Sequence, residues 1–327
     1  MRVAAIREVG GPEVLDLLER PEPEPGPGEI RVAVRATALN RADLLQRRGL
    51  YPAPPDSPAD VPGLEFAGEV DALGARVTEH AVGDRVFGIL GGGGYAEKVV
   101  TPARMAVRVP AHLSWEEAAA VPEVFITAHD ALFTQAGLGP GETVLLHTVA
   151  GGVGTAAVQL AHRAGAICFG TAGSAEKLAA AKALGLDLGI DRTAGDFAKV
   201  VKEHTGGAGV HVILDTVGPS YWEANLASLA RCGRLVLIGL LGMGPANLRA
   251  DLILNKRLRI FGTVLRSRPL EEKIAATQAF ARAVLPLLER RSLVPVIDRV
   301  FELAQVRDAH EYMERNANVG KIVLRVG

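Results

Sequence analysis

Residues 143–154, which read T-V-L-L-H-T-V-A-G-G-V-G, constrain the fold of this chain more than any other stretch. The β-branched and aliphatic residues at 143–146 predict a strand, and the amphipathic pattern of 153–164 predicts a helix. A glycine cluster lies between them and predicts a tight turn. The stretch therefore predicts a strand that passes through a glycine turn into a helix.

A glycine turn of this kind has two interpretations. In the dinucleotide-binding form, glycine lets the backbone approach a pyrophosphate, and the helix N-terminus favours the negative charge. The alternative is an ordinary turn, because the full G-x-G-x-x-G pattern is not met and Val149 stands where its first glycine belongs. The dinucleotide interpretation predicts that the pyrophosphate lies against Ala150, Gly151, Gly152, Val153 and Gly154.

The residues that follow Ser114 alternate between helix and strand patterns. Ser114 and Glu117 have the spacing of a capping box, which predicts the start of a helix. Such alternation predicts a doubly wound parallel sheet of the Rossmann type, covered by helices on both faces. After the opening strand and helix, we predict strands at 167–171, 188–191, 210–215, 234–239 and 258–265, and helices at 174–184, 196–204 and 221–231.

The first third of the chain is rich in short strand patterns. Clusters of glycine, proline and aspartate separate them, and strands at such spacing predict a compact barrel. Residues 41–46 predict one or two helical turns, and the proline-rich residues 51–62 predict a stiff loop that shapes a surface. The predicted strands are 2–6, 30–36, 68–72 and 85–89.

A chain of 327 residues exceeds what one hydrophobic core usually supports, so we expect two domains. A long helix at 270–289 and a final strand at 321–326 return the chain to the first domain. We therefore predict an α/β fold in which a dinucleotide-binding domain, residues 121–265, is inserted into a barrel-type domain made of residues 1–120 and 266–327.

The charge balance and the cysteine content exclude several classes of protein. Acidic and basic residues balance to a net charge of −1, so no overall field recruits nucleic acid or an anionic membrane. Cys168 and Cys232, the two cysteines, suggest neither a disulfide framework nor a zinc knuckle. No apolar run approaches the ~20 residues that cross a bilayer. We expect a cytoplasmic protein with no nucleic-acid or membrane partner.

The residues after the second predicted strand decide which dinucleotide is expected. NAD-preferring units carry an acid about 20 residues beyond the glycine cluster, where it binds the adenosine ribose. Here residues 170–174 hold no acid, while Gly173, Ser174 and Lys177 offer backbone, a hydroxyl and a positive charge, and Arg192 follows the third strand. These groups suit a 2′-phosphate, so we predict NADPH rather than NADH. The alternative is that Lys177 and Arg192 are ordinary surface charges.

With these residues in view, the chain resembles the zinc-free quinone oxidoreductases of the medium-chain dehydrogenase/reductase superfamily, the group of zeta-crystallin. The resemblance covers nearly the whole chain. It rests on the glycine cluster and on the motifs A-T-A-L-N-R-A-D-L-L-Q-R-R-G-L-Y, P-G-L-E-F-A-G-E-V, V-G-D-R-V, G-T-A-G-S-A-E-K-L and N-V-G-K-I-V-L. It implies a GroES-like catalytic domain around an inserted Rossmann domain, and a homodimer, which we place at the edge strand 258–265.

Zinc alcohol dehydrogenases of the same superfamily bind a catalytic metal through a cysteine, the histidine of a G-H-E motif and a further cysteine or acid. In this chain Asn40 stands at the place of the first cysteine and Leu64 replaces the histidine. Glu65 alone would be a poor zinc site, because zinc needs three or four ligands. We therefore expect no metal. A conjugated acceptor that is already electrophilic can be reduced without one.

The resemblance also implies roles for individual residues. Asn40 is implied to donate to the acceptor carbonyl. The alternative is a turn-stabilising amide, but its alignment with a superfamily ligand position favours the functional role. Tyr51 is implied to contact the substrate or the nicotinamide, while its alternative role is packing against the prolines that follow it. The residues implied to lie near the nicotinamide half of the cofactor are Thr127, Gly239, Leu240, Leu241, Thr263 and Lys321. For Thr127 the alternative is back-bonding within a helix, and for Lys321 it is plain solvation.

Two positions depart from the family. Residues 148–150 are bulkier than the usual approach to the pyrophosphate, and Arg192 replaces a residue that is commonly tyrosine. We predict an NADPH-dependent quinone oxidoreductase. The alternatives are an NADPH-dependent reductase of enones or enoyl thioesters and a catalytically silent NADPH-binding protein. The sequence leaves open the physiological acceptor and whether electrons move as a hydride or singly.

Overall fold

The computed structural model describes residues 1–242 and 244–327. The contacts of the chain divide it into two compact units: the first unit comprises residues 1–126 and 265–327, and the second unit comprises residues 127–264. The predicted domain borders follow residues 120 and 265.

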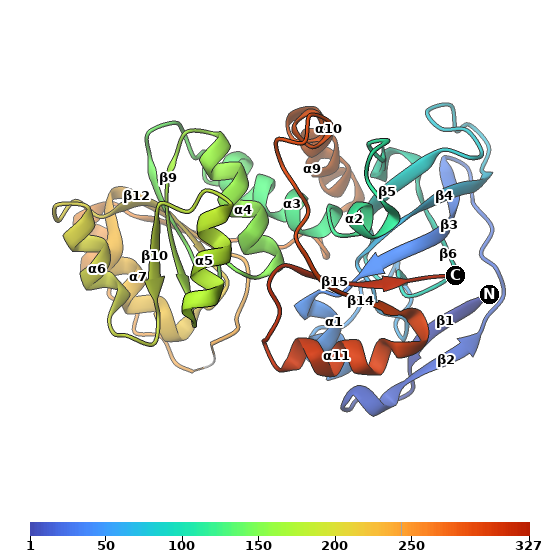
Figure 1. Cartoon of the computed structure of the whole chain (residues 1–327), viewed down its shortest axis with the longest axis horizontal. Coiled ribbons are helices and arrows are strands. Elements are labelled where there is room, and N and C mark those ends of the chain that lie inside the picture. The colour runs from blue at the N-terminus through green and yellow to red at the C-terminus, as the bar shows by residue number, and fades with distance from the viewer. Residues whose placement is uncertain (243) are drawn as a thin grey trace. The chain divides into compact units, whose positions relative to one another are not determined.

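The second unit contains a six-stranded parallel sheet with helices on both faces. Its strand order is β10-β9-β8-β11-β12-β13, so the order reverses between β8 and β11. Figure 1 shows α4 and α5 on one side of this sheet and α6 and α7 on the other. The predicted doubly wound Rossmann-type fold is confirmed. The strands are β8 Thr143–Leu146, β9 Ile167–Ala172, β10 Leu188–Asp191, β11 Val210–Asp215, β12 Leu229–Leu237 and β13 Arg259–Gly262.

The strand patterns explain why this sheet lies at the centre of its unit. All four residues of β8 are buried, as expected for a strand that is covered on both faces. The core extends from β8 to α6 and α7, with Phe197 and Leu226 packed among the strand residues. The helices are α4 Gly152–Arg163, α5 Ala175–Ala183, α6 Phe197–His204, α7 Trp222–Ser228 and α8 Ala250–Lys256.

Two predicted elements of the second unit differ from the structure. The helix predicted at 221–231 ends at Ser228, because Leu229 is buried and pairs in parallel with Val210, so that residues 229–231 already belong to β12. The strand predicted at 258–265 is shorter and spans only Arg259–Gly262.

The first unit is built on a seven-stranded mixed sheet with the strand order β14-β15-β3-β4-β5-β7, in which β6 also pairs with β3. β14 and β15 are parallel, and the other pairs are antiparallel. The expected GroES-like fold is confirmed. Its strands are β3 Glu29–Ala38, β4 Glu65–Leu73, β5 Arg85–Ile89, β6 Lys98–Pro102, β7 Ala106–Arg108, β14 Ile297–Glu302 and β15 Lys321–Arg325, with a separate pair β1 Arg2–Ile6 and β2 Leu15–Glu19.

The helices of the first unit follow their local signals. Ser114 accepts a hydrogen bond from the backbone N–H of Glu117, which confirms the capping box that begins α2. The helix predicted at 270–289 is interrupted at Val284, because Pro286 has no N–H to donate within a helix. The helices are α1 Arg41–Arg47, α2 Trp115–Ala119, α9 Leu270–Ala283, α10 Leu285–Glu289 and α11 Val306–Glu314, and α3 Pro122–His129 crosses from the first unit into the second.

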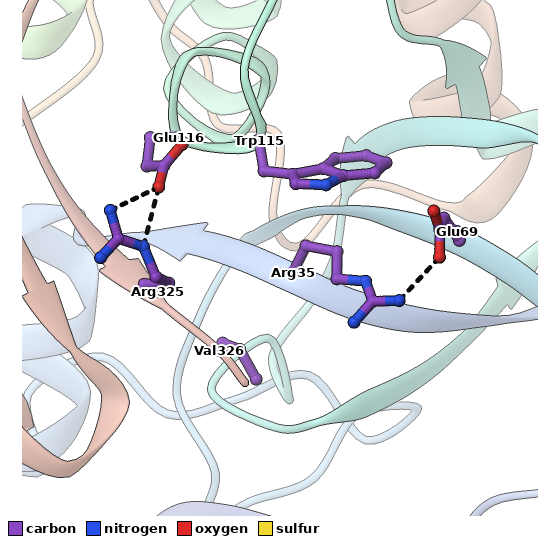
Figure 2. A pocket seen from close by; sticks show the side chains of 6 residues that line it. All are labelled: Arg35, Glu69, Trp115, Glu116, Arg325 and Val326. Atoms are coloured by element: carbon purple, nitrogen blue, oxygen red, sulfur yellow. Dashed lines mark hydrogen bonds and ion pairs between the residues drawn. The ribbon is translucent and has the colours of Figure 1, made fainter.

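A surface hollow of about 290 Å³ lies over the first unit's sheet. Figure 2 shows Arg35 of β3 directed at Glu69 of β4, and Arg325 of β15 directed at Glu116 of α2, with Trp115 between the two pairs. The hollow contains no residue that the sequence predicts for the site. Within the described residues, no helix is both long enough and apolar enough to span a membrane.

Candidate active site

The glycine turn of the second unit leads directly into the N-terminus of α4. Gly151 is the N-cap, and the first amides of a helix have no partner within it. A Cβ atom on Gly154 would lie 2.2 Å from the carbonyl oxygen of Thr148, so no side chain fits there. The backbone is therefore shaped as a pyrophosphate cradle requires.

Val149, which breaks the glycine pattern, does not obstruct this cradle. Its side chain is fully buried, and a Cβ atom on Gly170 of the neighbouring strand would lie 2.1 Å from its Cγ1 atom. Thr148 adopts a left-handed backbone conformation with φ of 55°, and its hydroxyl lies 2.9 Å from that of Thr216. The extra bulk of Val149 is thus taken up inside the unit, where Gly170 provides the space.

The predicted adenosine-end residues come together at the ends of β9 and β10. Ser174 is the N-cap of α5, and its hydroxyl oxygen accepts from the backbone N–H of Lys177 at 3.3 Å, so the hydroxyl proton stays available to a ligand. Arg192 lies over Gly173, since a Cβ atom there would be 3.0 Å from the guanidinium Nε. Arg192 also donates to the phenol of Tyr221, whose pKa burial raises. These groups suit a phosphate.

A buried hydrogen-bonded chain that the sequence did not predict lies beneath this region. His147 Nδ1 is 2.9 Å from the hydroxyl of Thr171, its Nε2 is 2.7 Å from Oδ1 of Asn225, and Asn225 Nδ2 donates to Asp215 at 3.0 Å. Because the Asn225 amide nitrogen faces the carboxylate, its oxygen faces the imidazole, so His147 donates from Nε2 and accepts at Nδ1. Burial lowers the pKa of His147 and keeps it neutral.

The residues predicted for the nicotinamide end lie at separate ends of elements. Gly239 follows β12, and a Cβ atom there would lie 2.9 Å from the carbonyl oxygen of Thr216. Leu240 and Leu241, which come next, are 61% and 50% exposed. Thr263, just after β13, donates its backbone N–H to Leu237. Leu240 and Leu241 are therefore apolar surface that a bound ring can cover.

Thr127 lies in α3 and is half-buried. Among the residues that the structure describes, its hydroxyl makes no hydrogen bond to the preceding turn, so the alternative role of back-bonding is not observed. The hydroxyl is free for another partner.

In the first unit, three residues from distant parts of the chain form a buried polar cluster. Lys321 is 3% exposed and Glu65 is 0% exposed, and their charged atoms are 2.8 Å apart. The ammonium group also donates to Oδ1 of Asn40 and to the backbone carbonyl of Leu39, both at 2.7 Å. Asn40 Nδ2 donates to Glu65 at 2.8 Å.

This cluster corrects the interpretation of Lys321. The sequence predicted either a cofactor contact or a solvated side chain. All three protons of the buried ammonium group are directed at acceptors within the first unit, which contradicts the solvated alternative. Its burial was not foreseeable, because Glu65 lies 256 positions away along the chain.

Glu123 is a second acidic group at this cluster that sequence reasoning missed. Its backbone N–H donates to the other oxygen of Glu65 at 2.8 Å. Its own carboxyl makes no hydrogen bond that the described residues show, and the charges of Glu65, Lys321, Asp43 and Arg266 act on it. Burial, reinforced by the charge of Glu65, raises the pKa of Glu123 to about 8. A carboxylic acid of this kind holds its proton at neutral pH.

Tyr51 is half-buried and held through its backbone and its ring. The guanidinium of Arg266 donates to the backbone carbonyl of Tyr51 at 3.1 Å and lies 5.0 Å from the ring centroid. Arg266 also donates to the carbonyl of Gly91 and to the amide of Gln46. The Tyr51 hydroxyl makes no hydrogen bond among the described residues, and burial raises its pKa. The phenol therefore keeps its proton and can donate it.

A further buried network fixes α1, which begins directly after Asn40. Tyr95 donates to Asp43 at 3.1 Å and lies 3.2 Å from His310, which in turn contacts Arg47 at 3.2 Å. Burial raises the pKa of Asp43 to about 6 and, together with the Arg47 charge, lowers that of His310 to about 3. Asp43 also accepts the backbone N–H of Asn40 at 2.7 Å, so this network sets where Asn40 lies.

The residues of the first unit do not fit a zinc site. Across residues 1–242 and 244–327, no group of three or more histidine, cysteine, aspartate or glutamate side chains could hold a metal ion. At the positions where zinc dehydrogenases carry ligands, Asn40 has an amide and Leu64 has an alkyl chain, and Glu65 is already paired with Lys321. No step of the chemistry proposed below passes through a metal.

Comparison with known families identifies the class of protein. Residues 26–111 match the alcohol dehydrogenase GroES-like domain, and residues 152–282 match the zinc-binding dehydrogenase family. A quinone oxidoreductase of Pseudomonas aeruginosa is 37% identical, over 96% of each chain. The chain therefore belongs to the quinone oxidoreductase-like family of the medium-chain dehydrogenase/reductase superfamily.

Other relatives broaden the comparison. The pikromycin polyketide synthase component PikAII of Streptomyces venezuelae is 38% identical over 93% of this chain, but the chain spans only 8% of that protein. Among solved structures, an Escherichia coli quinone oxidoreductase complexed with NADPH has a TM-score of 0.90 and 30% identity, covering 99% of this chain and 100% of that one.

An NAD-dependent alcohol dehydrogenase has the same TM-score of 0.90 with 35% identity and covers 100% of both chains. The CurK enoyl reductase has a TM-score of 0.88 with 29% identity and covers 100% and 99% of the two chains. The chain is thus a dehydrogenase/reductase whose solved neighbours differ in cofactor and acceptor.

Proposed function

We propose that this protein is an NADPH-dependent quinone oxidoreductase that reduces its acceptor without metal. The observation that carries the proposal is that the first unit offers an amide at Asn40, which stands at a zinc-ligand position of the zinc dehydrogenases, together with the phenol of Tyr51 and the carboxylic acid of Glu123. An electrophilic quinone needs proton donors and placement rather than a Lewis acid.

The choice of NADPH is supported by the adenosine end of the second unit. Ser174, Lys177 and Arg192 gather there, and Gly173 leaves space beneath the guanidinium. A 2′-phosphate would gain charge-assisted hydrogen bonds from these groups. The pyrophosphate would lie on residues 150–154, and Leu240, Leu241, Thr127 and Thr263 are proposed for the nicotinamide end. When bound, the cofactor supplies a hydride from nicotinamide C4.

The first unit would then handle the acceptor. Asn40 is proposed to donate to the acceptor oxygen, and Tyr51 to contact the acceptor ring. Glu123, with a pKa of about 8, holds a proton at neutral pH that the reduced acceptor can take up, after which solvent restores it. One hydride and one proton convert a quinone into a hydroquinone, so atoms and charge balance.

A second candidate function has its own support. The similarity to the CurK enoyl reductase and to a stretch of a polyketide synthase favours a reductase of enones or enoyl thioesters. That reaction uses the same hydride and also needs a proton donor, for which Glu123 is equally suited. A catalytically silent NADPH-binding protein is the remaining alternative, and the polar groups at 40, 51 and 123 argue against it.

The test is a comparison of steady-state rates with a panel of quinones and enones, using NADPH and NADH in turn. We expect the highest kcat/KM for a quinone with NADPH, and a hydroquinone product without free semiquinone in electron paramagnetic resonance. Faster turnover of enones would favour the second candidate. NADPH binding without oxidation by any acceptor would favour the silent protein, and higher kcat/KM with NADH would refute the cofactor assignment.

The assembly proposed for this function is a homodimer joined along β13, the edge strand of the second unit's sheet. An edge strand has unpaired backbone groups that a second copy can pair with. Sedimentation should give the mass of two chains, and a proline at Ile260, in the middle of β13, should yield monomers. A single-chain mass for the unmodified protein would refute the dimer.

A further inference from the structure

The side chain of Asn40 is held in one orientation by its neighbours. Lys321 has only donors, and its ammonium lies 2.7 Å from one end of the Asn40 amide. Glu65 accepts hydrogen bonds at 2.8 Å from the other end, and the carbonyl of Ala38 lies near that same end at 3.3 Å. If the amide turned over, its nitrogen would face an ammonium and its oxygen would face two acceptors.

The consequence is that Asn40 presents its amide N–H as a donor. Its oxygen already accepts from the Lys321 ammonium, and one amide proton is bonded to Glu65. The second amide proton has only the long contact to Ala38, which is beyond the usual length of an N–H···O bond. Asn40 is half-buried, whereas Lys321 and Glu65 are closed off from solvent. The part of the cluster that a ligand can reach is therefore this one N–H.

We propose that the buried Lys321–Glu65 ion pair is a positioning device that fixes Asn40 as a hydrogen-bond donor, and that the site consequently selects substrates with an acceptor oxygen at that point, namely the carbonyl of a quinone or conjugated ketone. This inference rests on the proposed function and deepens it. Lys321 and Glu65 then act on the reaction without touching the substrate, by orienting the side chain of Asn40.

The expected effect on kcat follows from the negative charge that develops on the acceptor's carbonyl oxygen. When the acceptor is reduced, its carbonyl oxygen gains negative charge, so a preset donor binds it more strongly at that stage than before. Loss of the oriented N–H should lower kcat more than it raises the KM of the acceptor. The KM for NADPH should stay the same, since the variants leave the second unit unchanged.

The experiment is a cycle of variants that separates positioning from stability. Lys321→Met alone leaves Glu65 buried without its partner and should unfold more readily. Lys321→Met with Glu65→Gln removes both charges, and should recover most of the stability while kcat for the quinone stays ~10- to 100-fold below that of the unmodified protein. Asn40→Ala should lower kcat by a similar factor.

The deciding variant combines all three changes. If the ion pair acts through Asn40, the triple variant should be no slower than the double one, because the same N–H is lost once. The inference is overturned if the double variant retains the original kcat, or if adding Asn40→Ala multiplies the loss. The matched control is Arg35→Met with Glu69→Gln, an exposed pair across β3 and β4 (Figure 2), which should leave kcat unchanged.

The same set of variants is also compared by the Kd of the quinone, measured on protein saturated with NADP⁺ so that no turnover occurs. We expect Kd to rise ~10-fold in the double variant and in Asn40→Ala, with no further rise in the triple variant. If this pattern holds but the unmodified protein reduces no quinone, the proposed function fails and the inference stands. If Kd does not change while the quinone is turned over, the inference fails and the function stands.

Discussion

The two units place buried polar groups in opposite ways. In the second unit, Thr171, a neutral His147 and Asn225 form a hydrogen-bonded chain that ends on the carboxylate of Asp215, and neutral groups separate the imidazole from that charge. In the first unit, Lys321 and Glu65 bring full charges together from opposite ends of the chain. Neutral groups connected by hydrogen bonds hold a shape with little penalty when one bond is removed, whereas removing one partner of a buried ion pair leaves an unpaired charge and is strongly destabilising.

The largest expected effect comes from breaking the charged cluster. Lys321→Met should lower the free energy of unfolding by about 3–5 kcal/mol, because Glu65 is left as an unpaired buried charge. Urea unfolding measures it. Thr171→Val, which removes one neutral hydrogen bond to His147, should cost about 1–3 kcal/mol. Equal losses for the two variants would remove the distinction between the units.

The second effect concerns the backbone of the glycine turn. Gly154→Ala places a Cβ atom 2.2 Å from the Thr148 carbonyl, so the turn must shift, with a loss of about 1–3 kcal/mol and weaker NADPH binding. Calorimetry of unfolding and of NADPH binding measures both. Gly139→Ala is the matched control, since the nearest atom there is 3.9 Å away. Unchanged NADPH affinity in Gly154→Ala would contradict the cradle.

The third effect is a pH dependence that only the first unit should show. Because the pKa of Glu123 is raised to about 8, the folded protein binds more protons than the unfolded chain between the ordinary glutamate range and about pH 8. This contribution to stability is complete at acid pH and is lost as the pH rises through about 8. Glu123→Gln should remove this slope from the melting temperature measured against pH.

The rate of acceptor reduction should follow the same group. In the unmodified protein kcat should fall above about pH 8, and in Glu123→Gln it should be lower and insensitive to pH in this range. Glu272→Gln, an exposed glutamate on α9, serves as the control and should behave like the unmodified protein. A basic limb that persists in Glu123→Gln would assign the proton to another group.

The smallest effect should be on cofactor choice. Lys177→Ala combined with Arg192→Ala should reduce the preference for NADPH over NADH ~10-fold, because two cations near the 2′-phosphate are lost. The ratio of kcat/KM values for the two cofactors measures it. Lys199→Ala, an exposed lysine on α6, is the control. If kcat/KM fell equally for NADPH and NADH, neither residue would bind the 2′-phosphate.

The same contrast explains which features the sequence could predict. The helices and strands of the second unit follow local periodicity, so most were predicted within a few residues, and the hydroxyl and amide of Ser174 were expected at a helix start. The start of β12 was missed, because Leu229 pairs with Val210, a contact that no local pattern shows.

The first unit's site was only partly predictable. Asn40 and Tyr51 were chosen through family resemblance, whereas Lys321 reaches Asn40 only because β15 pairs with β3, across 281 positions of the chain. Glu123 gave one signal, an acid inside the apolar run V-P-E-V-F-I-T, but acids are common in the first turn of a helix. Only the fold shows that this carboxyl faces another one.

The packing of Val149 against Gly170 has a consequence for how such chains are recognised. The glycine missing from the first strand's turn reappears on the adjacent strand, where Leu146 and Gly170 are register partners. A motif search confined to one loop counts position 149 as a lost glycine. The space that this glycine would leave is provided instead by Gly170 on the adjacent strand. Covariation between positions 149 and 170 would therefore be a better marker for this branch of dinucleotide-binding proteins than the loop pattern itself. Restoring glycine at 149 should remove the closest contact that a Cβ atom at 170 would meet, leaving the end of the Leu186 side chain at 2.9 Å as the next.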